Sequence, residues 1–239
     1  MKFICISDTH GLHESMAHTL PKADGIIHAG DFCNRGTMVE CMRVLGWFNA
    51  LPYKYRIIIA GNHDLFMDPN HPEQPSSESA IKAILPVSDG FHYLWNSGCE
   101  IEGIKFWGSP QQPEFFNWAF NLPRGNPLRK HWELIPGDTD VLITHGPAYG
   151  SVDRCPNFAD PYGNWVSVGD KDLAKKIRQI EPAVHVCGHV HASYGHSIIG
   201  TTTYINASIC NEGYFAVNKP IAFNIDTETK NITLIHHGL

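Results

Sequence analysis

Aspartate, asparagine and histidine side chains recur along this sequence at positions where short apolar runs end. The fullest example is Gly61-Asn62-His63-Asp64, which directly follows the run at 56–60. Asn62 offers an uncharged amide oxygen to a metal ion, while His63 offers a titratable ring that the Asp64 carboxylate could orient. Taken alone, the tetrapeptide is equally typical of a strand-to-loop turn, in which Gly supplies a positive φ and Asn and Asp form local hydrogen bonds.

The same pattern appears after other apolar runs. Asp8 and His10 follow the run at 2–7, and residues two apart in an extended chain point to the same side. As a local alternative, Asp8 could cap a helix and His10 could be a surface residue. The recurrence outweighs each local alternative, and the strand-end donors are Asp8, His10, Asp31, Asn62, His145, His189 and His191.

These donors need elements that bring their ends together. Apolar runs predict buried strands, and amphipathic spacing predicts helices between them. This strand-helix-strand order favours parallel pairing with right-handed crossovers, which gathers the donor loops at one edge of a sheet. The predicted strands are 2–7, 25–29, 53–60, 91–95, 101–107, 140–144, 183–187, 197–199, 202–207, 221–225 and 232–235, and the predicted helices are 37–50, 78–85 and 171–180.

Two long segments are predicted as loops. The aromatic segment 108–127 is predicted to overhang the site, and its rings are more typical of a satellite core than of a substrate platform. The segment 151–169 is loop-like as well. Neither an internal repeat nor a linker is present, so we predict a single domain over 1–239. Five histidines that lack the strand-end context are assigned no role: His13, His18, His71, His236 and His237.

Length and composition restrict the class of protein. With 239 residues, 43% of them hydrophobic, the chain can bury a full core. The formal net charge of -6 disfavours a stable nucleic-acid partner held by a broad basic surface, although bound metal ions would still permit a small anionic substrate. Seven scattered cysteines fit a reducing compartment. Because neither a signal peptide nor an apolar stretch of ~20 residues is apparent, we expect a cytoplasmic protein without a membrane partner.

The donor set itself indicates a metal chemistry. Mixed carboxylate, amide and imidazole ligands suit manganese, iron, zinc or magnesium better than a structural zinc site. Seven donors exceed what one tetrahedral ion can use. They match two ions about 3.5–4 Å apart that share a carboxylate, the arrangement that clamps the attacking and leaving oxygens of a phosphoryl transfer. We therefore predict two divalent metal ions, with manganese favoured and iron, zinc, magnesium or nickel as alternatives.

In order and spacing, the donor motifs resemble the five motifs of the calcineurin-like metallophosphoesterases. The stretches 120–125, 144–147 and 200–208 are similar to the metallophosphoesterase-domain-containing (MPPED) group, which is related to class III cyclic nucleotide phosphodiesterases. This resemblance implies an α/β fold, a four-layer α/β/β/α sandwich of two mixed sheets flanked by helices. The motifs are Asp8-x-His10, Gly30-Asp31, Gly61-Asn62-His63-Asp64, Thr144-His145-Gly146 and Gly188-His189-x-His191.

The resemblance also implies a division of the ligands between two metals. One metal would take Asp8, His10, Asp31 and His191, and the other would take Asp31, Asn62, His145 and His189, with Asp31 as the bridge. Some animal members replace the first histidine of the last motif by glycine. His189 is present here, which favours an active enzyme.

Catalytic roles follow from the same resemblance. His63, a non-ligand, would stabilise the transition state or protonate the leaving alkoxide, and Asp64 would fix its tautomer; the alternative is a supporting residue without a chemical role. Arg35 matches the phosphate-binding arginine of the Ser/Thr phosphatase branch, and a surface arginine at the start of a helix is equally plausible. The predicted substrate contacts are Arg35, Asn62 and His63. Arg124 and Arg154 are predicted to be solvated.

These features together predict the function. We expect a phosphodiesterase whose partner is a small phosphoester substrate, of the cyclic nucleotide class by resemblance. The alternatives are a phosphomonoesterase or protein phosphatase, and a non-catalytic binding module of the same fold. A homodimer is possible, because exposed faces and an aromatic loop permit one.

Overall fold

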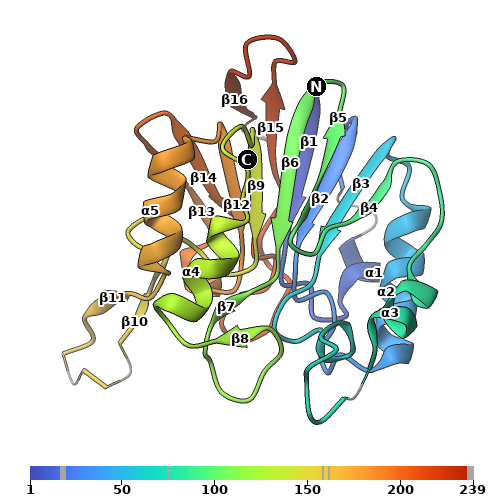
Figure 1. Cartoon of the computed structure of the whole chain (residues 1–239), viewed down its shortest axis with the longest axis horizontal. Coiled ribbons are helices and arrows are strands. Elements are labelled where there is room, and N and C mark those ends of the chain that lie inside the picture. The colour runs from blue at the N-terminus through green and yellow to red at the C-terminus, as the bar shows by residue number, and fades with distance from the viewer. Residues whose placement is uncertain (17–19, 75, 158, 161, 236–239) are drawn as a thin grey trace.

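A computed structural model describes residues 1–16, 20–74, 76–157, 159–160 and 162–235. The predictions for His18, His236 and His237 lie outside these residues. Two six-stranded sheets form the centre of the fold, and their strands lie face to face in Figure 1.

The first sheet has the order β16-β15-β1-β2-β3-β4. The four strands β1 to β4 are parallel, and β15 and β16 continue the sheet in antiparallel pairing. The sheet is therefore mixed, with four neighbouring parallel strands on one side and two antiparallel pairings on the other. Its strands are β1 (Lys2–Ile6), β2 (Gly25–Ala29), β3 (Tyr55–Ile59), β4 (Phe91–Tyr93), β15 (Ile221–Ile225) and β16 (Ile232–Ile235).

The second sheet has the order β13-β14-β12-β9-β6-β5. Its four central strands are parallel, and the edge strands β13 and β5 are antiparallel to their neighbours. The strands are β5 (Ser97–Ile101), β6 (Ile104–Ser109), β9 (Val141–Thr144), β12 (Val184–Cys187), β13 (Gly195–Ile199) and β14 (Thr202–Asn206).

Helices cover the outer face of each sheet, as Figure 1 shows. One apolar core joins α2 to the first sheet, a second lies between the sheets, and a third joins α4 and α5 to the second sheet. These three cores separate four layers, which confirms the predicted α/β/β/α sandwich. The helices are α1 (His13–Met16), α2 (Met38–Ala50), η1 (Leu65–Met67), α3 (Glu78–Ile84), α4 (Asn126–Glu133), α5 (Lys171–Ile180) and η2 (His191–Ser193).

Local sequence explains where the predicted helices begin. Thr37 caps α2 by accepting a hydrogen bond from the backbone N–H of Glu40, and Asp170 caps α5 by accepting one from Leu173. Leu173 and Ile177 form the buried face of α5. The predicted helices at 37–50, 78–85 and 171–180 are therefore confirmed to within one residue at each end.

Three predicted segments differ from the structure. The strand expected at 101–107 is instead a hairpin of β5 and β6, because Glu102 (φ 48°) and Gly103 (φ 77°) form a two-residue turn. The loop expected at 108–127 contains β7 (Gln112–Pro113), β8 (Asn121–Leu122) and the start of α4. The loop expected at 151–169 contains the hairpin β10 (Arg154–Pro156) and β11 (Trp165–Ser167), which projects from the body in Figure 1.

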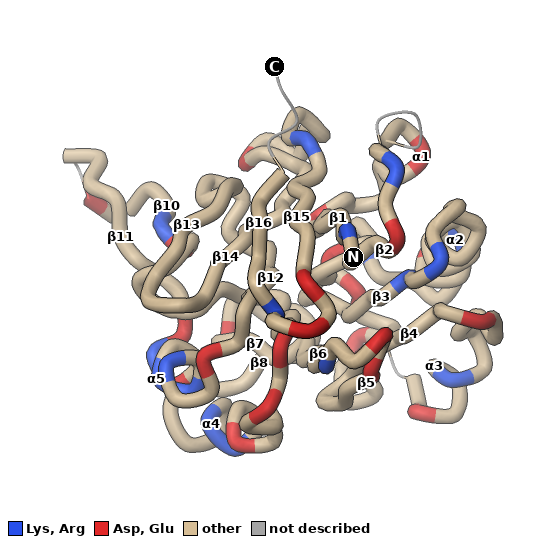
Figure 2. Tube along the Cα trace, turned by 90° about the horizontal axis from the view of Figure 1, so that it is seen from above, with Lys and Arg blue, Asp and Glu red and all other residues tan. Residues whose placement is uncertain are grey.

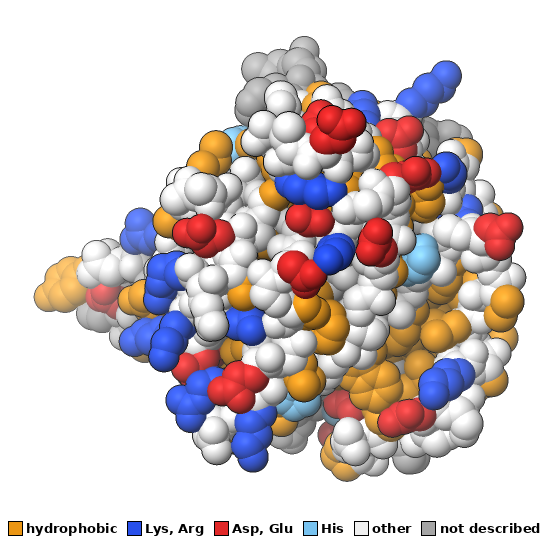
Figure 3. Space-filling view, turned by 45° about the horizontal axis from the view of Figure 1, so that its top comes forward, with side chains coloured by type: hydrophobic (Ala, Val, Ile, Leu, Met, Phe, Trp, Pro, Cys, Tyr) orange, Lys and Arg blue, Asp and Glu red, His pale blue; other side chains and the backbone are white. Residues whose placement is uncertain are grey.

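The surface carries mixed charge in the views shown. Figure 2 shows acidic and basic residues interspersed along the elements. Lys and Arg side chains gather over α4 and α5 in Figure 3, with acidic side chains beside them. None of the described helices is both long and apolar enough to cross a membrane.

Candidate metal centre and active-site pocket

The loops after five parallel strands meet at one edge of the two sheets. Loops after β1, β2 and β3 bring side chains from the first sheet, and loops after β9 and β12 bring side chains from the second. Metal-ligating atoms of Asp8, His10 and His191 form one compact group, and those of Asp31, His145 and His189 form another. The atoms of each group lie within 4.8 Å of one another. The structure thus brings the predicted ligands together.

Several of these ligands have a strained backbone. Asp8 (φ 52°), His10 (φ 43°), Asp31 (φ 55°) and His189 (φ 66°) all occupy the left-handed region, which non-glycine residues rarely adopt. Such conformations persist only where the surrounding structure enforces them, and they cluster at functional sites. The turns therefore serve to aim the side chains.

Two motif glycines leave room for the ligands. A Cβ atom on Gly61 would lie 2.3 Å from Asp31 Oδ1, and one on Gly188 would lie 2.1 Å from Asp8 Oδ2. Both distances are below any tolerable contact, so a larger residue at either position would displace a carboxylate. Glycine at these positions reflects close approach of the backbone to the ligands.

The first donor group suits a cation. His10 Nε2 and His191 Nε2 lie 3.2 Å apart, and His191 Nε2 lies 3.3 Å from Asp8 Oδ1. His191 Nδ1 donates to the Asn211 carbonyl at 2.9 Å, which leaves Nε2 as the ring nitrogen that faces Asp8 and His10. Two ring nitrogens and a carboxylate oxygen that converge in this way can share a cation, which takes the place of the proton on Nε2. These residues fit a divalent metal.

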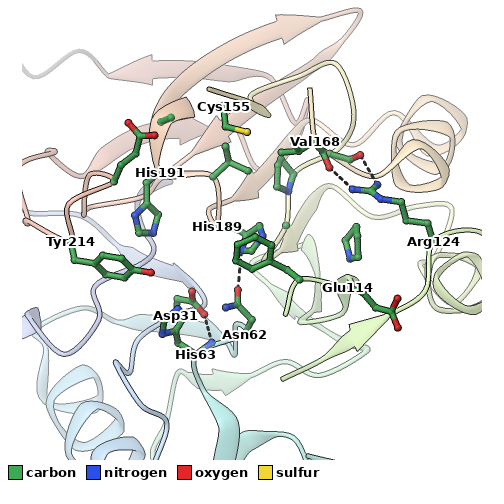
Figure 4. Close-up of a pocket in the computed structure, with 18 residues that line it drawn as sticks. Asp31, Asn62, His63, Glu114, Arg124, Cys155, Val168, His189, His191 and Tyr214 are labelled. Carbon is green, nitrogen blue, oxygen red and sulfur yellow. Dashed lines mark hydrogen bonds between the residues drawn. The ribbon is translucent and has the colours of Figure 1, made fainter. Parts of the chain in front are cut away.

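The second donor group is arranged in the same way. His145 Nδ1 donates to the Ala29 carbonyl at 2.9 Å, and its Nε2 lies 3.3 Å from Asp31 Oδ1 and 2.9 Å from Asn62 Oδ1. His189 Nδ1 lies 2.8 Å from the same Asn62 oxygen (Figure 4). Asn62 thus joins the second group as predicted.

Asp31 lies between the two groups. Its Oδ1 faces His145, and its Oδ2 lies 4.0 Å from His10 Nε2 in the first group. Its Oδ1 also accepts a hydrogen bond of 2.7 Å from the backbone N–H of His63. The carboxylate thus faces donors of both groups, and its bridging role stays a prediction.

The carboxylates of the site are held in their ionised form. Burial alone would raise the pKa of Asp8, but the hydrogen bond and positive charge of His191 lower it well below the usual range. Burial likewise opposes ionisation of Asp31, and the charges of His145, His63 and His10 lower its pKa well below normal. Both groups therefore remain anionic, as metal ligands must.

The imidazoles of the site differ in the direction of their pKa shifts. Burial would lower the pKa of His145, but the charge and hydrogen bond of Asp31 raise it to about 9. Burial and the charge of His145 lower the pKa of His189 to about 3. A metal ion must displace the proton on His145, so metal binding should release protons.

His63 lies beside the ligands and is oriented differently from the prediction. Its Nδ1 lies 2.8 Å from the Asn34 carbonyl, which can only accept, so Nδ1 carries the proton and Nε2 is left for the pocket. Asp64 instead accepts backbone N–H bonds from Gly61 at 2.7 Å and Cys33 at 2.8 Å. Among the described contacts, the predicted Asp64–His63 hydrogen bond does not form, because the carboxylate organises the two loops.

A loop near the C-terminus supports the ligands and was not predicted as part of the site. Ser208 Oγ lies 2.8 Å from Asp8 Oδ2 and 2.7 Å from Asn206 Oδ1, and Asn206 Nδ2 donates to the Val190 carbonyl at 2.8 Å. The available signal was the strand at 202–206, which ends in polar residues like the donor strands. Such supporting contacts hold ligands in place.

A cavity of about 390 Å³ opens over the ligands. Its wall includes Phe115 and Tyr214, which are 47% and 48% exposed. Tyr214 is packed against His10 with ring centroids 4.7 Å apart, and Phe115 against His189 at 5.3 Å. Asp31, Asn62 and His63 form the polar floor in Figure 4.

Of the three arginines considered from the sequence, Arg124 alone is among the residues that line this cavity. The exposed Arg35 is not among the residues that line it, and its backbone N–H donates to Glu40 Oε2 at 3.0 Å. Arg124 lies on the wall, but its guanidinium donates to the Val168 and Gly169 carbonyls at 2.5 and 2.8 Å (Figure 4). Arg154 donates to the Trp165 carbonyl at 3.3 Å and is exposed, as predicted.

Comparisons with known proteins identify the family of the chain. The calcineurin-like phosphoesterase family matches residues 1–193. Metallophosphoesterase domain-containing protein 1 of Homo sapiens is 37% identical over 243 residues, covering 95% of this chain and 71% of that protein. A UPF0046 protein of Caenorhabditis elegans is 37% identical over 235 residues, covering 96% of this chain and 77% of that protein.

Solved structures show the same fold. Phosphopantetheinyl hydrolase (PptH) from Mycobacterium tuberculosis has a TM-score of 0.58 at 16% identity, with 99% of this chain and 96% of that chain covered. At this identity the likeness concerns the fold alone. The sequence matches carry the assignment further, and they show that this chain belongs to the calcineurin-like phosphoesterase family.

Proposed function

We propose that the protein is a dinuclear metal-dependent phosphodiesterase that acts on small phosphodiesters, cyclic nucleotides among them. The observation that carries this proposal is the position of Asp31 between two donor groups. A shared carboxylate with separate imidazole partners on each side suits two ions, and manganese is the favoured metal. When bound, such a pair supplies charge neutralisation for the phosphoryl oxygens and an activated water.

Residues of the chain position the substrate and supply the proton for the leaving group. Asn62 and the ligands on the floor of the cavity place the phosphoryl group beside His63. Hydrolysis forms a bond from phosphorus to a water oxygen and breaks the bond to the ester oxygen, which needs a proton. His63 holds one proton at Nδ1 against Asn34, so a second proton at Nε2 is the one it can donate to the leaving oxygen.

The charge of the cavity favours a diester over a monoester. Among the described residues that line it, Arg124 is the one Lys or Arg, and its guanidinium is occupied by backbone carbonyls. A phosphate monoester dianion or a polyphosphate would leave charge that the metals alone must neutralise, whereas enzymes that bind such groups commonly use a bidentate arginine. Phe115 and Tyr214 instead offer apolar surface to an ester group.

Initial rates on protein loaded with Mn²⁺ test the proposal. We expect bis-p-nitrophenyl phosphate to be hydrolysed faster than p-nitrophenyl phosphate, and the His63→Ala variant to lose about 10²-fold or more of the diesterase rate. His196→Ala, at an exposed position in β13, serves as the control. A monoester preference would contradict the diesterase proposal. Absence of hydrolysis of either ester by metal-loaded protein would contradict the enzymatic proposal.

A further inference from the structure

We propose that Trp118 is a positioning residue that holds the His63 imidazole in its working orientation. The inference rests on the proposed function for its kinetic consequence, but the contact itself is a property of the fold. His63 is nearly buried, with 7% of its surface exposed, and the indole of Trp118 stacks on its ring. The ring centroids lie 4.0 Å apart with an interplanar angle of 22°.

Hydrogen bonding alone does not fix this imidazole. The bond from Nδ1 to the Asn34 carbonyl selects which nitrogen faces the cavity, but a single bond leaves the ring free to rock about it. The indole covers one face of the ring and restricts that motion. His10 adds a near-perpendicular contact, with centroids 4.6 Å apart and planes at 77°. Two different restraints therefore act on one ring, one on the nitrogen and one on the plane.

The loop that carries Trp118 is fastened on both sides of it. The backbone N–H of Ala119 donates to the Asn62 carbonyl at 3.1 Å, and that of Phe120 donates to Asp68 Oδ2 at 2.8 Å. The carbonyl of Asn117 lies 3.0 Å from Nε2 of the buried His71. All three partners belong to the segment that contains His63 itself, so Trp118 and His63 are positioned by the same piece of backbone.

His71 has the tautomer that this fastening requires. Its Nδ1 accepts a hydrogen bond from the backbone N–H of Glu73 at 3.3 Å, which places the ring proton on Nε2. Nε2 can then donate to the Asn117 carbonyl. A histidine that the sequence left without a role thus holds the loop from one side, and Asp68 holds it from the other.

Trp118 also packs against the core beside the first sheet, and a merely structural role would predict only a loss of stability. A leucine at position 118 could take over the packing role of Trp118 but not its role in positioning His63. Leucine restores much of the apolar volume but offers no flat face to the imidazole, whereas phenylalanine offers a smaller flat face. Trp118→Leu and Trp118→Phe therefore separate stacking from packing. Phe116→Leu, in the same loop and 80% exposed, is the matched control.

The kinetic test compares two diesters that differ in their leaving group. Bis-p-nitrophenyl phosphate releases a stable phenolate, whereas diphenyl phosphate releases a more basic one that needs proton donation. We expect Trp118→Leu to lower kcat about tenfold for diphenyl phosphate and at most about twofold for bis-p-nitrophenyl phosphate, with KM nearly unchanged. Trp118→Phe should recover most of the loss, and Phe116→Leu should match the parent.

A double-mutant cycle assigns the effect to His63. In the His63→Gln background, Trp118→Leu should change kcat by less than about twofold, because the residue through which it acts is gone. Equal losses in both backgrounds would overturn the inference. So would an equal loss for both esters, since this is the result of a general disturbance of the site.

A spectroscopic measurement tests the contact without turnover. In protein labelled at histidine, the His63 ring protons should resonate upfield because of the indole ring current, with their assignment taken from His63→Gln. The upfield shift should disappear in Trp118→Leu and persist in Phe116→Leu. Its absence in the parent would overturn the inference. If the parent shows the shift but hydrolyses no diester, the proposed function fails while the contact stands.

Discussion

The two sheets contribute different chemistry to one site. Loops of the first sheet bring the oxygen donors Asp8, Asp31 and Asn62 together with His10, whereas loops of the second sheet bring imidazoles alone: His145, His189 and His191. The negative charge of the centre therefore comes from one half of the sandwich and most of its nitrogen from the other. Neither half alone contains the complete ligand set proposed for either metal.

Hydrogen bonds between the two halves of the sandwich also fix the ligands in place. The backbone N–H of His189 donates to both oxygens of Asp8 at 3.0 Å, and His145 Nδ1 donates to the carbonyl of Ala29 at the end of β2. These bonds cross between the sheets, whose facing sides share one apolar core. The complete site thus exists only when the two sheets are packed together, so packing and ligand geometry are coupled.

The largest effect should come from removing the charge that the two halves share. Asp31→Asn keeps the shape of the side chain but removes the anion that faces both donor groups. We expect hydrolysis to fall by about 10³-fold or more and bound metal to drop from two ions per chain to one or fewer, measured by rates and elemental analysis. Asp89→Asn, at an exposed position, should match the parent. Retention of two ions by Asp31→Asn would contradict the bridging role.

Asn62→Ala should affect the second group selectively. Its amide oxygen lies 2.9 Å from His145 Nε2 and 2.8 Å from His189 Nδ1, and both histidines belong to the second group. We expect a loss of roughly 10²-fold in kcat with the first metal retained, so that elemental analysis finds about one ion per chain. A variant as active as the parent would eliminate the two-metal proposal.

Two buried histidines, one in each sheet, allow the acid sensitivity of the two sheets to be compared. His28 in β2 and His185 in β12 are fully buried, and burial lowers the pKa of each to about 3. Because the unfolded chain binds these protons near pH 6.5 and the folded chain does not, stability is lost as the pH falls from about 6.5 towards 3. Each site should contribute roughly 2–3 kcal/mol of this loss by pH 4.5.

Urea unfolding of metal-free protein between pH 7.5 and 4.5 measures the effect. The unfolding free energy should fall less steeply with decreasing pH in His185→Gln, by the contribution of about one bound proton. His28→Gln should show a similar change. The comparison is informative because nearby Asp8 and Asp31 oppose the shift at His28, whereas burial is the whole cause at His185. An unchanged pH slope in His185→Gln would show that this residue is not held neutral.

The smallest effect should come from Ser208→Ala, which removes the hydroxyl beside Asp8 while leaving every metal ligand in place. Contacts of this kind usually change affinity or activity by about 10-fold or somewhat more. We therefore expect a modest rise in the Mn²⁺ concentration needed for half-maximal activity. Ser151→Ala, whose hydroxyl bonds the Ala148 carbonyl, is a control outside the ligand network.

Much of the fold and of the site could be predicted because both depend on local pattern. Apolar runs ending in Asp8, Asp31, Asn62, His145 and His189 identified the strands and the edge at which they meet. The hairpin turn at Glu102–Gly103 was missed because β5 is largely polar and small (Ser-Gly-Cys-Glu-Ile), so only the apolar residues from Ile101 onward indicated a strand. The start of α4 was missed because Gly125 and Pro127 read as turn residues, whereas proline is well tolerated in the first turn of a helix.

The sequence by itself determined the ligand types, their order along the chain and the edge at which they meet, because strand ends in a parallel sheet must share an edge. The layered architecture was implied by the resemblance to the calcineurin-like metallophosphoesterases. Tertiary structure decided what surrounds His63 and Arg35. The carbonyl of Asn34 and the ring of Trp118 restrain His63 in place of Asp64, and Arg35 lies outside the cavity. These partners come from separate loops and bond through backbone atoms or ring faces. Sequence spacing cannot specify such contacts, because they depend on how the loops pack against one another.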